Sequence, residues 1–204
     1  MKYLNNLPDH KYPWLPILYS MVQYIRPKTI IEFGTEHGKT AITMALALKE
    51  LYELDGHIGK VYSYDTFQHQ AKGEIGSSPD YHMAMNYVNK FPISVSDYIE
   101  ISAGDFFEFN QSTDKHFDLL YFDIDNDGDK LLEMYRQCKH LIDAGSIVIF
   151  EGGSITRDQV PWMQNLHKRT MNSVKDEVPY VLLTNDQKYS CSIIYNPLIY
   201  NIEL

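Results

Sequence analysis

The chain is poor in the residues that build zinc sites and disulfide frameworks. Its 204 residues include only two cysteines, Cys138 and Cys191, with neither a CxxC spacing nor a nearby pair of histidines. This pattern supports neither a structural zinc site nor a disulfide framework. We therefore expect both thiols to be reduced and buried.

Long apolar runs are also missing. No segment approaches the roughly 18 apolar residues that span a membrane, and the first residues, MKYLNNLPDHKYPW, lack the apolar core of a signal peptide. We therefore expect a cytoplasmic protein that does not have a membrane as a partner.

Positive charge is scarce. Lys and Arg number 18 against 27 Asp and Glu, which gives a formal net charge of −9 at pH 7. Proteins that grip phosphate backbones over a broad face need many Lys and Arg contacts. The composition therefore argues against nucleic acid as a main partner.

The chain does contain enough apolar material for a sizeable core. Its hydrophobic fraction of 44% and charged fraction of 22% are close to those of soluble globular domains. The length, together with the absence of repeats and low-complexity linkers, predicts one domain over residues 1–204. Within it, residues 1–28 are expected to form an N-terminal helical cap and residues 29–195 the core.

Strand-like and helix-like segments alternate along most of the chain. Runs rich in β-branched and aromatic residues predict strands at Thr29–Phe33, Val61–Tyr64, Ile99–Ser102, Asp118–Phe122 and Ser146–Phe150. Apolar periodicity predicts helices at Trp14–Ile25, Lys39–Leu54, Tyr81–Lys90, Lys130–Ile142 and Asp158–Met171. This alternation is typical of a parallel sheet that is covered by helices on both faces.

The last part of the chain breaks this rhythm. Two strand-like runs, Tyr180–Leu183 and Tyr189–Tyr195, are joined only by TNDQK, a link that is too short for a parallel crossover. The predicted fold is therefore an α/β, three-layer Rossmann-like sandwich whose mostly parallel seven-stranded sheet ends in an antiparallel hairpin. The polar segment Gln68–Asp80 is expected to be a loop over the site.

The segment Glu32–Thr40 (EFGTEHGKT) is the first candidate for ligand binding, because ligands of open α/β sheets lie beyond the carboxyl ends of the strands. Its glycines allow close approach of the backbone, and the following helix offers N–H groups to a carboxylate. Glu32 can hold an ammonium group. A ligand with both charges, such as the methionine part of S-adenosylmethionine, suits this segment. The candidate cofactor-binding residues here are Glu32, Phe33, Gly34, Thr35, Gly38, Lys39 and Thr40.

Two later strand ends extend this set. Asp65, followed by Thr66, ends the second strand and can accept hydrogen bonds from both hydroxyls of a ribose. Gly104, Asp105 and Phe106 follow the third strand and can offer a hydrogen-bonding side chain and a ring to an adenine. Ribose and base are thereby both accounted for.

The ordered motifs of the chain resemble those of a known family. IIEFGTEHGKTAITMALAL, VYSYDTF, ISAGDFFEF, FDLLYFDIDNDGD and LIDAGSIVIFEGG are similar to the motifs of class I S-adenosylmethionine-dependent methyltransferases, over about residues 29–195. The resemblance is nearest to the small-molecule O-methyltransferase-like group. It implies S-adenosylmethionine as cofactor and transfer of a methyl group to an oxygen of a small-molecule acceptor. Where that group has an Asp-Gly-Asp-His type sequence, this chain has Asp123-Ile124-Asp125-Asn126.

Carboxylates at the ends of the fourth and fifth strands are candidates for a metal site. Asp123 and Glu151 follow strands that we expect to be neighbours, about 4.8 Å apart, and Asp125 can supply a third oxygen. Such ligands suit Mg²⁺ or Ca²⁺ better than zinc. Asp123 is also expected to face the cofactor or the acceptor, and Asp127 to cap the helix that follows.

Histidines supply the candidates for a general base. His37, His69 and His82 are all expected near the site, and histidine is the residue type that most often serves as a general base. His69 is favoured, because it follows the strand end at Asp65 within the expected loop over the site.

Two alternative functions remain. Gly34-x-x-x-Gly38-Lys39-Thr40 resembles a P-loop, but three residues instead of four separate its first glycine from Gly-Lys, and Glu32 would repel phosphates. A P-loop-like nucleotide hydrolase is the leading alternative. The other is a non-catalytic, methyltransferase-like module that binds the nucleoside.

Overall fold

The computed structural model describes residues 1–8, 12–67, 81–108, 116–165, 167–185 and 189–196. Within these ranges, seven strands form one mixed sheet in the order β3-β2-β1-β4-β5-β7-β6. This confirms the predicted α/β class, with a mostly parallel sheet and a C-terminal antiparallel hairpin. The chain divides into two units, Met1–Lys115 and His116–Leu204, while the single domain expected over residues 1–204 stays a prediction.

The first unit is built on three parallel strands. The pairs are β1 with β2 and β2 with β3. The elements are η1 (Leu4–Asn6), α1 (Leu15–Ile25), β1 (Thr29–Phe33), α2 (Lys39–Asp55), β2 (Lys60–Asp65), α3 (Tyr81–Lys90), η2 (Ser96–Tyr98) and β3 (Ile99–Ala103). The predicted strands and α-helices of this unit agree with these bounds to within one residue.

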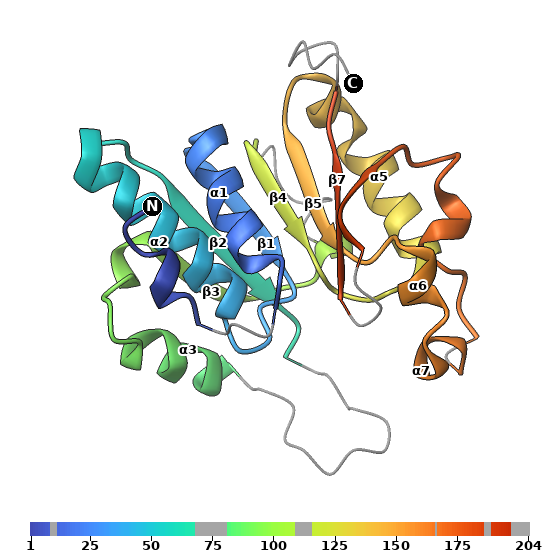
Figure 1. Cartoon of the computed structure of the whole chain (residues 1–204), viewed down its shortest axis with the longest axis horizontal. Helices are drawn as coiled ribbons and strands as arrows, with labels where there is room; N and C mark the ends of the chain where they lie inside the picture. Colours follow the sequence, from blue (N-terminus) through green and yellow to red (C-terminus); the bar gives the residue numbers. More distant parts are fainter. Residues whose placement is uncertain (9–11, 68–80, 109–115, 166, 186–188, 197–204) are drawn as a thin grey trace. The chain divides into compact units, whose positions relative to one another are not determined.

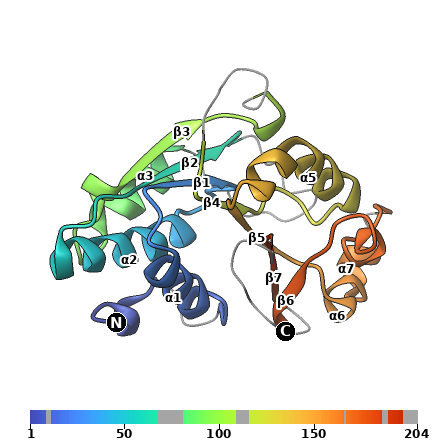
Figure 2. The ribbon, with the colours of Figure 1, turned by 90° about the horizontal axis from the view of Figure 1, so that it is seen from above.

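Helices α1 and α2 lie side by side along one side of these strands (Figures 1 and 2). α2 is rich in Ala, Leu and Met, which are strong helix formers, and most of its residues are buried. α1 packs on it through an apolar stripe that includes Leu18 and Val22. The hydroxyl of Tyr19 also donates a hydrogen bond to Glu50 of α2. Helix α1 therefore packs against α2, while the helical cap expected over residues 1–28 stays a prediction.

The second unit combines a parallel pair of strands with the hairpin. β4 and β5 are parallel, β5 and β7 are antiparallel, and β7 also pairs with β6. The elements are β4 (Leu119–Phe122), α5 (Gly128–Asp143), β5 (Ile147–Glu151), α6 (Ile155–Asp158), α7 (Pro161–Gln164), η3 (Asn172–Val174), β6 (Val181–Asn185) and β7 (Ser190–Ile194). Asp127 caps α5 by accepting a hydrogen bond from the N–H of Asp129 at 3.0 Å, which confirms that prediction.

The prediction of a helix over Asp158–Met171 is wrong. Two short helices and an irregular segment replace it, because Pro161 has no N–H to continue α6 and instead begins α7. Beyond α7, the carbonyl of Arg169 accepts a hydrogen bond from the N–H of Gly128 at 2.7 Å. These contacts outside the local chain take the place of helical hydrogen bonds.

Both cysteines are buried and reduced, as expected. Burial raises the pKa of the Cys138 thiol to about 12, so this thiol is inert at neutral pH. Of the helices in the described ranges, none is long and apolar enough to cross a membrane.

Candidate functional site

The loop between β1 and α2 has the backbone shape that a close ligand contact needs. Gly34 and Gly38 have φ angles of 101° and 78°, in a backbone region that residues other than glycine rarely adopt. Gly38 is the N-cap of α2 and carries no side chain that could accept from the first N–H groups of the helix. The positive end of the helix dipole is therefore not capped by its own N-cap residue.

Glu32 is completely buried beside this loop. Its two carboxyl oxygens accept hydrogen bonds from the hydroxyls of Thr40 and Ser63. Burial raises the pKa of Glu32 to about 7, and the charge of Asp65 adds to this rise, while the two hydrogen bonds oppose it. Near neutral pH the carboxyl group is therefore poised between its neutral and charged forms.

Asp65, the last residue of β2, accepts hydrogen bonds from the backbone of two loops, the one after β1 and the one after β2. One carboxyl oxygen accepts from the N–H of Glu36 at 2.9 Å, and the other accepts from the N–H of Phe67 at 2.8 Å. Thr66, which follows Asp65, is exposed.

The segment after β3 meets β2 closely. A Cβ atom at Gly104 would lie 3.2 Å from the ring of Tyr64, so only glycine fits here without a shift of that ring. Asp105 accepts a hydrogen bond from the N–H of Phe107 at 2.8 Å. Phe106 is buried, and its ring packs edge-on against Phe33 with the centroids 5.1 Å apart.

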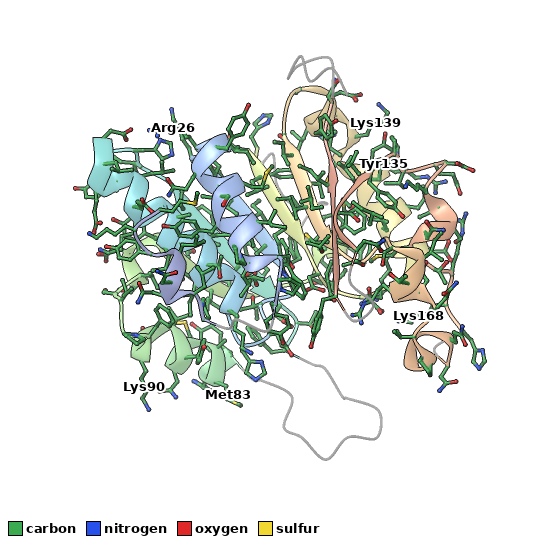
Figure 3. All side chains as sticks on the ribbon, in the orientation of Figure 1. Arg26, Met83, Lys90, Tyr135, Lys139 and Lys168 are labelled. Atoms are coloured by element: carbon green, nitrogen blue, oxygen red, sulfur yellow. The ribbon has the colours of Figure 1, made fainter. Side chains whose placement is uncertain are left out.

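The candidate metal ligands of the second unit have cationic partners. Asp125 pairs with Lys130 at 3.0 Å and with Lys168, which is labelled in Figure 3. Glu151 pairs with Arg157 at 2.8 Å. Among the described residues, no group of three or more His, Cys, Asp or Glu side chains is arranged to hold an ion. Two of the three predicted ligands are therefore already neutralised, which does not fit an Mg²⁺ or Ca²⁺ site.

The remaining catalytic candidates are placed as follows. Asp123 directly follows β4 and is half-buried. Burial raises the pKa of the Cys191 thiol, and the charges of Glu151 and Asp123 add to this rise. His69 and the predicted loop Gln68–Asp80 lie outside the described residues. His37 is half-buried, with its ring 3.6 Å from the carboxylate of Glu36.

Sequence reasoning missed two polar residues that the structure places in contact with predicted ones. Ser63 lies directly beside Glu32 in the β1–β2 register, which the sequence alone does not give. Arg157, which pairs with Glu151, directly precedes the wrongly predicted helix. No pattern in the sequence could have paired these two residues.

Comparisons with known proteins identify the family and the fold of the chain. A family model described as a methyltransferase domain matches residues 31–151, more than half of the chain. No curated protein matches at a significant level.

Solved structures show the same fold at low identity. A putative O-methyltransferase from Klebsiella pneumoniae has a TM-score of 0.61 and 18% identity over 95% of this chain and 87% of its own. An O-methyltransferase from Bacillus cereus, solved with SAH, has a TM-score of 0.57 and 17% identity over 93% and 83%. The O-methyltransferase TomG from Streptomyces achromogenes, solved with SAM, has a TM-score of 0.59 and 15% identity over 90% and 80%.

Proposed function

The chain belongs to the methyltransferase domain family, and from this membership we propose that it binds S-adenosylmethionine and transfers the methyl group to an oxygen of a small-molecule acceptor. The observation that carries the proposal is the buried Glu32 beside the glycine loop that begins α2. Sulfonium chemistry makes the methyl group electrophilic when this cofactor is bound. The residues of the chain then have to bind the cofactor, orient its methyl group and select the acceptor.

The charges around the loop suit an amino acid moiety. Glu32 is an anion when ionised and is matched to an ammonium group, while the uncapped N–H groups at the start of α2 are matched to a carboxylate. A phosphate would meet the charges of both Glu32 and Asp65. In addition, the hydroxyl of Thr40 already donates to Glu32, whereas a P-loop hydroxyl would serve a metal ion. These points disfavour the nucleotide hydrolase.

The strand ends that follow provide for the nucleoside. We propose that the carboxylate of Asp65, at the end of β2, binds the ribose hydroxyls, and that the loop Gly104–Phe106 lies against the adenine. Asp105 is the polar side chain of this loop, and Phe106 holds the loop in place by packing its ring against Phe33. Asp123 is proposed to face the acceptor, and His69 stays the predicted base.

Ligand-dependent thermal stability tests this proposal. S-adenosylmethionine and S-adenosylhomocysteine should each raise the melting temperature, because a ligand that binds only the folded state stabilises it by mass action. At 100 times Kd the gain is about 2.7 kcal/mol, so a shift of several degrees is expected. ATP with magnesium should give no shift. A response to ATP alone would contradict the proposal and favour a nucleotide hydrolase.

Replacing Asp65 tests the ribose contact. Asp65→Ala is expected to weaken binding of S-adenosylhomocysteine by about 1.5 to 3 kcal/mol, the usual cost of losing hydrogen bonds to a charged group. Adenine alone, which has no ribose, should lose much less affinity. Asp55→Ala is the matched control, because Asp55 ends α2 at the surface and pairs with Arg26. Equal affinities of the Asp65 variant and the parent, measured by calorimetry, would place the ribose elsewhere.

Product formation separates an enzyme from a module that only binds. Incubation with labelled S-adenosylmethionine and a panel of hydroxylated metabolites should yield a labelled, methylated product. Tight cofactor binding with no transfer to any of a broad panel would favour the non-catalytic module.

A further inference from the structure

Ser63 and Thr35 extend the contacts of Glu32 into a chain of side-chain oxygens. Ser63 lies beside Glu32 in the β1–β2 register and donates its hydroxyl hydrogen to one carboxyl oxygen of Glu32. Behind Ser63, the hydroxyl oxygen of Thr35 lies 2.6 Å from that of Ser63. Glu32, Ser63 and Thr35 are each at most 1% exposed, so water does not compete for these hydrogen bonds.

The directions of the hydrogen bonds depend on the charge of Glu32. When Ser63 and Thr40 both donate to Glu32, as they do here, the carboxyl group needs no hydrogen of its own. Ser63 then accepts from Thr35, and every hydroxyl points toward the carboxylate. A protonated Glu32 must donate to one of its neighbours. If that neighbour is Ser63, the hydrogen bond that Thr35 donates to Ser63 reverses, and Ser63 donates to Thr35.

We propose that Ser63, supported by Thr35, is a positioning residue that fixes the carboxylate of Glu32 and sets the pH range in which it is charged. The role of Glu32 as the partner of a ligand ammonium group rests on the proposed function. The hydroxyl chain itself is a property of the protein without ligand. Thr35 also links the chain to the loop, because its carbonyl accepts a hydrogen bond from the N–H of Gly38, the N-cap of α2.

The charged groups of Asp65 and Lys39 do not take over the role of these hydroxyls in stabilising ionised Glu32. Asp65 on β2 is the charged group whose field acts on Glu32, and it opposes ionisation. On α2, the ammonium of Lys39 lies over the ring of Tyr12, 5.0 Å from its centroid. Ionised Glu32 is therefore stabilised by the hydroxyls of Ser63 and Thr40 against both burial and the charge of Asp65.

Titration of Glu32 without ligand tests the proposal directly. Carbon NMR of the Glu32 carboxyl group gives its midpoint in the parent and in Ser63→Ala. Loss of one hydrogen bond to a charged group should raise this midpoint by about one pH unit or more. Thr35→Val should raise it less, and Thr35→Ser, which restores the hydroxyl, should return it to the parental value. Ser102→Ala is the control, because Ser102 pairs with Tyr64 and so alternates to the opposite face of the sheet from Ser63.

Binding of S-adenosylhomocysteine from pH 6 to pH 9 gives the second readout. Ser63→Ala should lose about fivefold or more in affinity at pH 7, because the ionised fraction of Glu32 falls, and recover most of it at pH 9, whereas a merely structural role would lower affinity equally at all pH values. Unchanged midpoints in both Ser63→Ala and Thr35→Val would overturn the proposal. If Ser63→Ala does not fold, the titration midpoints of Glu32 in Thr35→Val and Thr35→Ser decide between the two outcomes. If the parent binds no S-adenosylhomocysteine at any pH, the proposed function fails, while the NMR titration still decides the role of Ser63.

Discussion

Replacing Glu32 by glutamine is expected to weaken binding of S-adenosylhomocysteine at pH 8 by about 2 to 4 kcal/mol, roughly 30-fold to 1000-fold. Glu32 is completely buried, so a ligand ammonium group placed beside it would be paired in a medium with little water. Glutamine keeps the shape of the side chain; its amide oxygen can accept from one of the two hydroxyls of Thr40 and Ser63, and its NH2 group can donate to the other, but it carries no charge. The loss therefore reports the charge and not the packing.

The same residue gives binding a defined pH dependence. Because the pKa of Glu32 is raised to about 7, its carboxyl group is mostly neutral in the free protein at pH 6. A cationic ligand group needs the charged form, so affinity should fall about tenfold for each pH unit below 7. In Glu32→Gln this dependence should disappear.

Stability should change with pH in the opposite direction. The folded protein favours neutral Glu32, so this group's contribution to stability is fully present below its ordinary pKa of 4.5 and is lost as the pH rises through about 7. The amount is roughly 3 kcal/mol, and it should be absent from Glu32→Gln. Urea unfolding of both proteins from pH 4.5 to pH 8 measures the difference. Curves of unfolding free energy against pH that run parallel for the two proteins would contradict a raised pKa of Glu32.

Replacing Arg157 by methionine is expected to destabilise the protein by about 3 to 5 kcal/mol at neutral pH. The side chains of Arg157 and Glu151 are only 7% and 11% exposed, and they form an ion pair at 2.8 Å. Removing the cation leaves the carboxylate of Glu151 buried without this partner. The loss should shrink when Glu151 is replaced by glutamine in the same chain, because a neutral amide costs less to bury.

A surface pair provides the control for this experiment. Lys139 pairs with Asp143 at 2.6 Å, but both side chains are more than half exposed, and Lys139 is labelled at the surface in Figure 3. Lys139→Met should therefore change the urea midpoint very little. Equal effects of Lys139→Met and Arg157→Met would show that burial does not strengthen the Arg157 pair.

The sequence predicted most of the fold because the period of its apolar residues changes wherever the structure changes. β2 alternates in burial along its whole length, and α2 is rich in strong helix formers, so both patterns can be read locally. The segment after β5 could not be predicted in this way. There, a bond from Gly128 to Arg169 and the break at Pro161 outweigh a helical pattern that is real but local.

The candidate site was predictable to the extent that strand ends carry it. Glu32, Asp65 and Asp105 all lie at or just after the ends of parallel strands, where ligands of such sheets bind. The partners of these residues were not predictable, because register and packing determine them. Ser63 reaches Glu32 through the register of two strands, and Arg157 reaches Glu151 through a turn with two positive-φ glycines, Gly152 and Gly153.

A crystal structure with S-adenosylhomocysteine tests the central claim most directly. The account predicts the amino group of the ligand at Glu32, its carboxylate at the first N–H groups of α2, and its ribose hydroxyls at Asp65. A ligand bound away from both Glu32 and Asp65, or crystals that take up none at saturating concentration, would contradict it.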